Sequence, residues 1–281
     1  MKSIAVLASV AVACLVAACS ASESGATATP QPSSVPTLTP SPSATPASTL
    51  PPSSEWGRLD QKLATYVPGM VDGLSFAVTS PDKVLFAKGY GSQTAETVEL
   101  IASATKLPSA LAILTLADEG RLDLDAPVAK YLQGRIDWPA DKAAITMRML
   151  LNHTSGLQLE PVCLLGQRIA LKDCAQTIAR APLVFAPGTA FGYGGGSFQV
   201  AGYVAEVLSG ISWNQFFDQS IGRPLGLTRF RYALASADNS RIAGGGESDV
   251  GDYSRIVQMV LGGGVFQGKR ILSDNTMAEL R

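Results

Sequence analysis

The sequence predicts an α+β fold in which a strand hairpin precedes a long helical region. Two runs rich in β-branched and aromatic residues, 74–78 and 84–90, flank a Ser-Pro-Asp turn signal at 80–82. Leucine, isoleucine and alanine then recur at helical spacing from position 103 onward. Because two strands alone form a marginal sheet, the apolar face of this antiparallel hairpin should need further strands.

The helices are expected in order along the rest of the chain. Gly120 and Gly210 follow helical segments as stop signals, and Ser273 can cap a final helix. Pro108 lies in the first turns of the first helix, where it should bend or fix the start. The expected helices are 103–119, 145–151, 171–181, 198–208, 213–221 and 249–261, and a weak hairpin is expected at 265–272.

Residues 1–18 have the pattern of a signal peptide. Lys2 supplies a positive start, and Ile4 to Ala18 is a mostly apolar run, short for a membrane span. The run ends in Val-Ala-Ala-Cys at 16–19, which resembles a bacterial lipobox. That resemblance implies cleavage before Cys19 and lipidation of its thiol. The alternative is an ordinary secreted signal followed by a chance cysteine.

Residues 19–54 are expected to be a lipid-anchored linker. Beyond Cys19 the stretch is nearly all serine, threonine, proline and alanine, which cannot bury enough apolar surface to fold. From residue 55 to 281 the composition is that of one globular domain. The sequence therefore predicts a domain held near a membrane in the cell envelope, outside the cytoplasm.

The charge of the chain and its cysteines indicate which kinds of partner and cross-link to expect. The chain has 22 basic and 23 acidic residues, a net charge of −1, and no basic run, so nucleic acid is not an expected partner. In an oxidising compartment, Cys163 and Cys174 are expected to form a disulfide. A metal site is the alternative, but two cysteines with no nearby histidine offer too few ligands.

Ser103 and Lys106 are the candidate catalytic pair. At this spacing on a helix both side chains lie on one face, and a lysine can activate a serine hydroxyl if it can take up a proton. Ser80 and Lys83 match the same pattern, but the intervening Pro-Asp indicates a hairpin turn. The alternative for Ser103 is a serine at a helix N-terminus followed by a surface lysine.

Six sequence motifs, one of which contains this pair, occur in a consistent order along the chain. They are Val-Leu-Phe-Ala-Lys-Gly-Tyr-Gly at 84–91, Ser-Ala-Thr-Lys at 103–106, Glu-Gly-Arg-Leu-Asp-Leu-Asp-Ala-Pro-Val at 119–128, Leu-Leu-Asn-His-Thr-Ser-Gly-Leu at 150–157, Pro-Gly-Thr at 187–189 with Phe191 and Tyr193, and Arg-Pro-Leu-Gly-Leu at 223–227. Together they resemble the serine β-lactamase/penicillin-binding-protein superfamily. The most similar group is its class C-like branch, which includes D,D-peptidases and esterases with a β-lactamase fold.

The resemblance implies a β-lactamase/transpeptidase-like fold and an acyl-enzyme mechanism. By this resemblance, Ser103 is expected to be the acylated nucleophile, Lys106 to share in proton transfer, and Tyr193 to act as or assist the general base. The implied substrate is a small-molecule or peptidoglycan-like acyl compound, and neither a metal nor an organic cofactor is expected. His153, the single histidine, falls in a structural segment of the family, which argues against a Ser-His-Asp mechanism.

Two departures from the family pattern bear on activity. Gly195 stands where the family has an asparagine that hydrogen-bonds the substrate amide and the lysine. No Lys-Thr-Gly or His-x-Gly tripeptide occurs, and Ser-Asp-Asn at 273–275 comes too late to be the family's second motif. We therefore expect the domain to lack its C-terminal strands. The alternative function is an inactive or truncated member that serves as a binding module or is a gene fragment.

Overall fold

The computed structural model describes residues 56–165 and 168–280. The predicted signal peptide, Cys19 and the linker lie outside this range. The helices are α1 Gly57–Ala64, α2 Lys106–Asp118, α3 Ala129–Leu132, α4 Met147–Leu151, α5 Leu171–Arg180, α6 Gly196–Ser209, α7 Trp213–Phe217, α8 Arg223–Leu225, α9 Val250–Leu261 and α10 Asp274–Ala278. The strands are β1 Gly73–Thr79, β2 Val84–Gly91, β3 Glu99–Leu100, β4 Arg231–Tyr232, β5 Gly246–Ser248, β6 Val265–Phe266 and β7 Lys269–Arg270.

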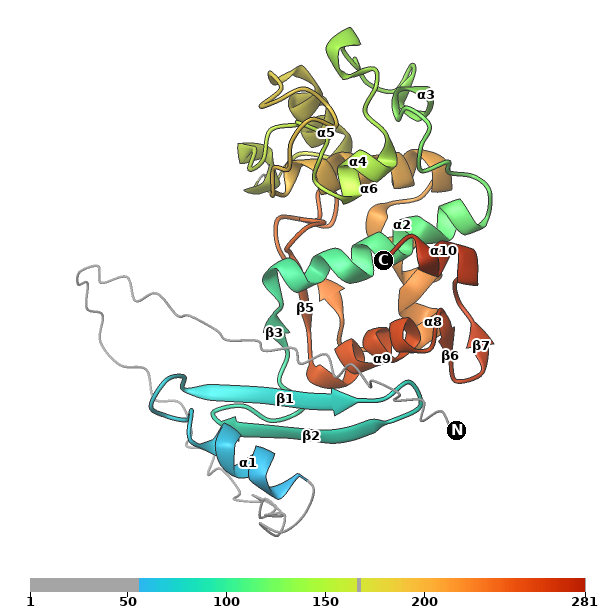
Figure 1. Cartoon of the computed structure of the whole chain (residues 1–281). Coiled ribbons are helices and arrows are strands. Elements are labelled where there is room, and N and C mark those ends of the chain that lie inside the picture. Colours follow the sequence, from blue (N-terminus) through green and yellow to red (C-terminus); the bar gives the residue numbers. More distant parts are fainter. Residues whose placement is uncertain (1–55, 166–167, 281) are drawn as a thin grey trace, which may run out of the picture.

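The predicted hairpin is present as the antiparallel pair β1–β2. It lies between α1 and α9 (Figure 1). A small core of Leu63, Leu74, Phe76, Phe86 and Tyr90 joins α1 to the sheet. No other strand of the described residues pairs with this hairpin, and α9 lies against β1 instead.

The main core is built around α2 and α6. Leu111, Ala112, Ile113 and Leu116 of α2 are fully buried, because this helix is apolar on all sides. It packs against α6, α7 and α10, while α6 also contacts α3, α4 and α5 (Figure 1). Gly210, with φ of 78°, ends α6 in the left-handed conformation expected of a stop glycine.

A second sheet, with strand order β3-β5-β4, corrects the expectation that only the weak hairpin would add strands late in the chain. Its strands are two or three residues long and come from three separate parts of the sequence. Strands this short show no alternating pattern, so only the tertiary pairing of distant segments identifies them. The hairpin expected at 265–272 is present as β6–β7.

Two predicted helices have different boundaries. The helix expected over 103–119 begins as the 3₁₀ turn η1, Ala102–Thr105, and becomes α-helical at Lys106. The helix expected over 213–221 is α7 followed by the π-helical turn η4, Asp218–Gly222. Local spacing predicts helical residues, but the choice among hydrogen-bonding patterns depends on packing.

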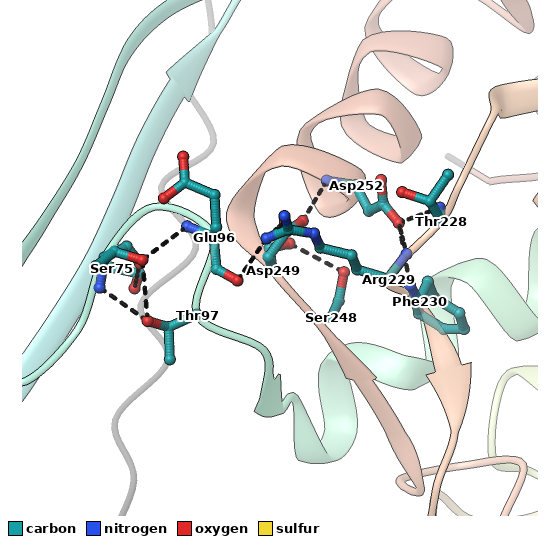
Figure 2. A network of polar contacts seen from close by, with 10 residues as sticks. Ser75, Glu96, Thr97, Thr228, Arg229, Phe230, Ser248, Asp249 and Asp252 are labelled. Carbon is teal, nitrogen blue, oxygen red and sulfur yellow. Dashed lines mark hydrogen bonds and ion pairs between the residues drawn. The ribbon is translucent and has the colours of Figure 1, made fainter. Parts of the chain in front are cut away.

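A polar network fastens the hairpin side of the molecule to α9 (Figure 2). Arg229 donates to the carbonyl of Glu96 at 2.7 Å and forms an ion pair with Asp249, which caps α9. Asp252 Oδ2 accepts the backbone N–H groups of Thr228, Arg229 and Phe230 at 2.7, 2.6 and 3.0 Å. One buried carboxylate therefore satisfies three consecutive backbone donors.

Replacing Asp252 with alanine should lower the free energy of unfolding by about 3 kcal/mol, because three partly buried backbone N–H groups lose a charged acceptor. Urea denaturation measures the change. The matched control is Asp274→Ala, which removes an exposed carboxylate paired with Arg270 and should cost under about 1 kcal/mol. Equal losses in the two variants would contradict a structural role specific to Asp252.

Candidate active site

Ser103 lies in the turn η1 between β3 and α2. Ala102 before it has φ of 44°, a conformation that L-residues seldom adopt. The turn is held from both sides, because Ile101 N–H donates to the carbonyl of Gly246 at 2.9 Å and Thr105 Oγ1 accepts from Gly246 N–H at 3.0 Å. Strand β5 thus fixes the segment that carries the serine.

Lys106, the first residue of α2, reaches back to the serine. Its Nζ lies 3.2 Å from Ser103 Oγ and donates to the carbonyl of Ala243 at 3.0 Å. The i, i+3 spacing brings the two side chains together, as the sequence indicates. Ala243, from the loop before β5, adds an acceptor that holds the lysine tip beside the hydroxyl.

Tyr193 lies beside Lys106, with its ring centroid 4.5 Å from Nζ. Partial burial raises the pKa of the phenol, but hydrogen bonding to Lys106 and Ser103 and the charge of Lys106 outweigh this effect. The pKa of Tyr193 is therefore below its ordinary value of 10.0. The lowered pKa makes the phenolate form easier to reach, and the phenolate of this half-exposed side chain can accept a proton from a serine hydroxyl.

The ring of His153 packs against the ring of Tyr193. Its centroid lies 4.7 Å from that of the Tyr193 ring and 5.4 Å from that of the Phe198 ring. Burial, together with the charge of Lys106, lowers the pKa of His153, so the imidazole is neutral at pH 7. The imidazole thus packs against the phenol ring as part of its platform, which agrees with a structural position for this histidine.

The segment after Tyr193 depends on glycine. A Cβ at Gly194 would lie 2.3 Å from the carbonyl oxygen of Leu159, and one at Gly196 would lie 2.0 Å from that of Gln158. These approaches let the loop run against residues 158–160, where Gly196 N–H donates to the carbonyl of Leu159 at 3.0 Å. The two glycines therefore allow the loop after Tyr193 to pack closely against residues 158–160, and this packing helps to position Tyr193.

Gly195 differs from its neighbours, because side chains surround it. A Cβ there would meet Leu164 Cδ1 at 2.6 Å, Glu160 Oε1 at 3.6 Å and Ala243 Cβ at 3.7 Å. Leu164 is buried and leaves little room for an asparagine. The N–H of Gly195 donates to Glu160 Oε1 at 2.9 Å. The side chains of Leu164 and Glu160 therefore lie next to the place where the family's asparagine side chain would be.

The other sequence candidates lie apart from this constellation. Ser80 accepts from Lys83 N–H within the turn between β1 and β2, as the Pro-Asp signal indicates. Ser273 caps α10 and bonds to Asp118 at the end of α2. Cys163 and Cys174 form a disulfide, the pairing expected from the sequence, which joins the 3₁₀ turn η3, Val162–Leu165, to α5.

Metal and membrane features are absent from the parts of the chain that the structure describes. Within residues 56–165 and 168–280, no cluster of three histidine, cysteine, aspartate or glutamate side chains is arranged to hold a metal ion. Nor does any helix in those ranges have the length and apolar character needed to cross a bilayer.

Ala243 and Glu160, both of which the structure places at this site, are not identified from the sequence. A backbone carbonyl such as that of Ala243 carries no sequence signal beyond the run of glycines at 244–246. Glu160 is 57 positions from Ser103, and nothing in its local sequence marks it. The one available clue was Gly195, because an absent side chain raises the question of which group fills its space.

Comparison with known proteins identifies the family. The Beta-lactamase family model matches residues 59–268. "Putative D-alanyl-D-alanine carboxypeptidase" of Escherichia coli O157:H7 is 27% identical over 197 residues, 61% of this chain and 45% of its own length. "Acyltransferase calJ" of Penicillium decumbens is 33% identical over 171 residues, 52% of this chain and 41% of its own length. The chain thus spans less than half the length of these curated relatives.

A solved structure gives the same result for the fold. "Crystal structure of putative beta-lactamase from Bacteroides dorei DSM 17855" superposes with a TM-score of 0.71 at 32% identity, covering 80% of this chain and 68% of that chain. The chain belongs to the Beta-lactamase family, in the superfamily of serine β-lactamases and penicillin-binding proteins. The fold class expected from the sequence is therefore confirmed.

The charge of Lys106 should control the ionisation of Tyr193. In Lys106→Met the phenolate loses its neighbouring cation, so the pKa of Tyr193 should rise and tyrosinate absorbance should appear at higher pH. Ultraviolet difference titration against Tyr193→Phe isolates this residue. Lys130→Met is the control, because its ammonium lies over Tyr131 instead. An unchanged titration of Tyr193 in Lys106→Met would contradict the coupling.

Proposed function

We propose that this protein is a serine hydrolase that forms an acyl-enzyme on Ser103. The supporting observation is the position of Lys106 Nζ, 3.2 Å from Ser103 Oγ and 4.5 Å from the centre of the Tyr193 ring. A nucleophile, a cation and a phenol of lowered pKa at such distances are the groups that acyl transfer requires. Membership of the Beta-lactamase family agrees with this chemistry.

The proposed reaction has two balanced halves. Ser103 Oγ attacks the acyl carbonyl carbon, and its proton passes to the Tyr193–Lys106 pair. That proton then goes to the departing alcohol or amine as its bond to the acyl carbon breaks. A water molecule next attacks the ester carbon, gives up a proton to the same pair, and releases the acid while Ser103 regains its hydroxyl.

Esters and peptide-like amides are better candidate substrates than β-lactams. Gly195 offers no side-chain amide to hold a substrate, and one lost hydrogen bond costs about 0.5–1.5 kcal/mol. An ester, which has a better leaving group, tolerates that loss best. Among the relatives, one is named a putative D-alanyl-D-alanine carboxypeptidase and another an acyltransferase, and both names refer to reactions at an acyl carbon.

Replacing Ser103 with alanine should abolish covalent labelling by a fluorescent phosphonate and lower nitrophenyl ester hydrolysis by about 10³-fold or more, because the nucleophile is lost. Ser80→Ala is the matched control, since Ser80 has the same Ser-x-x-Lys spacing in a turn. It should label and hydrolyse like the wild type. Equal labelling of Ser103→Ala and wild type would contradict the mechanism.

A second candidate function, a binding module without turnover, is favoured by one sequence fact. Residue 195 is glycine, so the side-chain amide that the resembled family offers the substrate at this position is missing. The labelling experiment separates the two functions, because a module that only binds leaves no covalent label on Ser103.

We also propose that the protein works in the cell envelope, held there by lipid on Cys19. The support is the charged start, the apolar run and the Val-Ala-Ala-Cys sequence of residues 1–19. In a bacterial host, Cys19→Ser should move the protein from the membrane pellet to the released fraction. Cys14→Ser, which changes a cysteine inside the signal segment, is the control and should stay in the pellet. Release of both variants, or of neither, would argue against the anchor.

A further inference from the structure

The carbonyl of Ala243 that accepts from Lys106 belongs to a long loop. Residues 233–245 join β4 to β5 without a helix between them. Loops of this length are uncommon inside a compact domain, and they keep one conformation only where neighbouring elements hold them. The position of the Ala243 carbonyl therefore depends on the contacts that other elements make with this loop.

Ile242, the residue before Ala243, has both of its backbone polar groups bound by side chains from two helices. Gln199 Oε1, on α6, accepts the N–H of Ile242 at 3.3 Å. Ser109 Oγ, on α2, donates to the carbonyl of Ile242 at 2.7 Å. Gln199, Ser109 and Ile242 are buried, so these bonds are made away from bulk water. We call this pair of contacts the Ile242 clamp; it fixes the peptide plane that leads into Ala243.

Gln199 also binds the loop through its amide nitrogen. Its Nε2 donates to the carbonyl of Ser240 at 2.9 Å and to Asn239 Oδ1 at 2.8 Å. Asn239 in turn donates to the carbonyl of Cys163 at 2.9 Å, at the disulfide. The amide of a glutamine has two donors and one acceptor oxygen, and here all of them meet partners on one loop.

We propose that the Ile242 clamp keeps the Ala243 carbonyl in the place where it anchors the ammonium of Lys106 for proton transfer. Gln199 and Ser109 are thus positioning residues, which act through the loop and not on the reacting atoms. The inference rests on the proposed function, because that function assigns the proton transfer to Lys106. An amine released from the carbonyl would spend time in rotamers turned away from the serine, and misplacement of this kind lowers the rate of the chemical step.

Gln199→Met tests the clamp, because it keeps the length of the side chain and removes its three polar contacts. For a nitrophenyl ester, kcat should fall about tenfold while KM stays within about twofold, since a misplaced amine affects the transition state more than binding. Ser109→Ala removes the bond to the carbonyl of Ile242 and one to the hydroxyl of Tyr232, and should lower kcat about threefold.

Ultraviolet titration of Tyr193 reports the position of Lys106 without any turnover. Burial and the charge of Glu160 raise the pKa of the phenol, whereas hydrogen bonds to Lys106 and Ser103 and the charge of Lys106 lower it. In Gln199→Met the ammonium is held less firmly, so the pKa of Tyr193 should rise. Difference spectra against the same variant carrying Tyr193→Phe isolate this residue.

Gln93→Met is the matched control. Gln93 is also buried and uses both ends of its amide, because it accepts from Ser75 at 2.9 Å and donates to Glu99 at 3.2 Å, but it lies beside the β1–β2 hairpin. This variant should lose stability in urea, as Gln199→Met does, yet keep the kcat and the Tyr193 titration of the wild type. Equal losses of kcat in the two variants would overturn the inference, because they would show a general effect of removing a buried amide.

The remaining outcomes separate this inference from the proposed function. An unchanged titration of Tyr193 in Gln199→Met overturns the inference alone, whatever happens to kcat, because the amine has not moved. If Gln199→Met does not fold, Ser109→Ala decides, and an unchanged kcat and titration in that variant overturn the inference. If wild type leaves no phosphonate label on Ser103, the proposed function fails and the role of the clamp in proton transfer fails with it.

Discussion

The burial of helix α2 is the constraint on which the site depends. Its central residues are fully buried between α6, α7 and α10, so rotation of the helix would expose apolar side chains and leave cavities. A helix that cannot rotate fixes the direction of every side chain on it. Lys106, at its first turn, is therefore directed at Ser103 and at the carbonyl of Ala243 by the packing of residues well away from the chemistry.

Neighbouring groups in the site shift the pKa of the Tyr193 phenol in opposite directions. Burial and, more weakly, the charge of Glu160 raise the pKa of Tyr193, whereas hydrogen bonds to Lys106 and Ser103 and the charge of Lys106 lower it. Arg241 partly neutralises that carboxylate. The net shift is downward, so the hydrogen bonds and the charge of Lys106 outweigh burial and the charge of Glu160.

Close backbone packing gives this site its shape. The tyrosine loop can lie against residues 158–160 only because residues 194 and 196 have no Cβ. The same approach brings Glu160 to the N–H of Gly195. The departure from the family's asparagine is thus part of a local repacking that includes the buried Leu164, and the vacated space is filled by other side chains.

The sequence alone determined the features that local patterns encode. Helical spacing located α2, α5, α6 and α9, turn chemistry distinguished Ser80 from Ser103, and ordered motifs indicated the family. Tertiary structure decided the rest: the three short strands of the second sheet, the 3₁₀ turn at Ser103, and the meeting of Glu160 with Gly195. The physical reason is the sequence distance over which each kind of interaction acts. Propensity and periodicity act over a few residues, whereas these features come from contacts between segments tens to more than a hundred residues apart, which leave no mark on the local sequence.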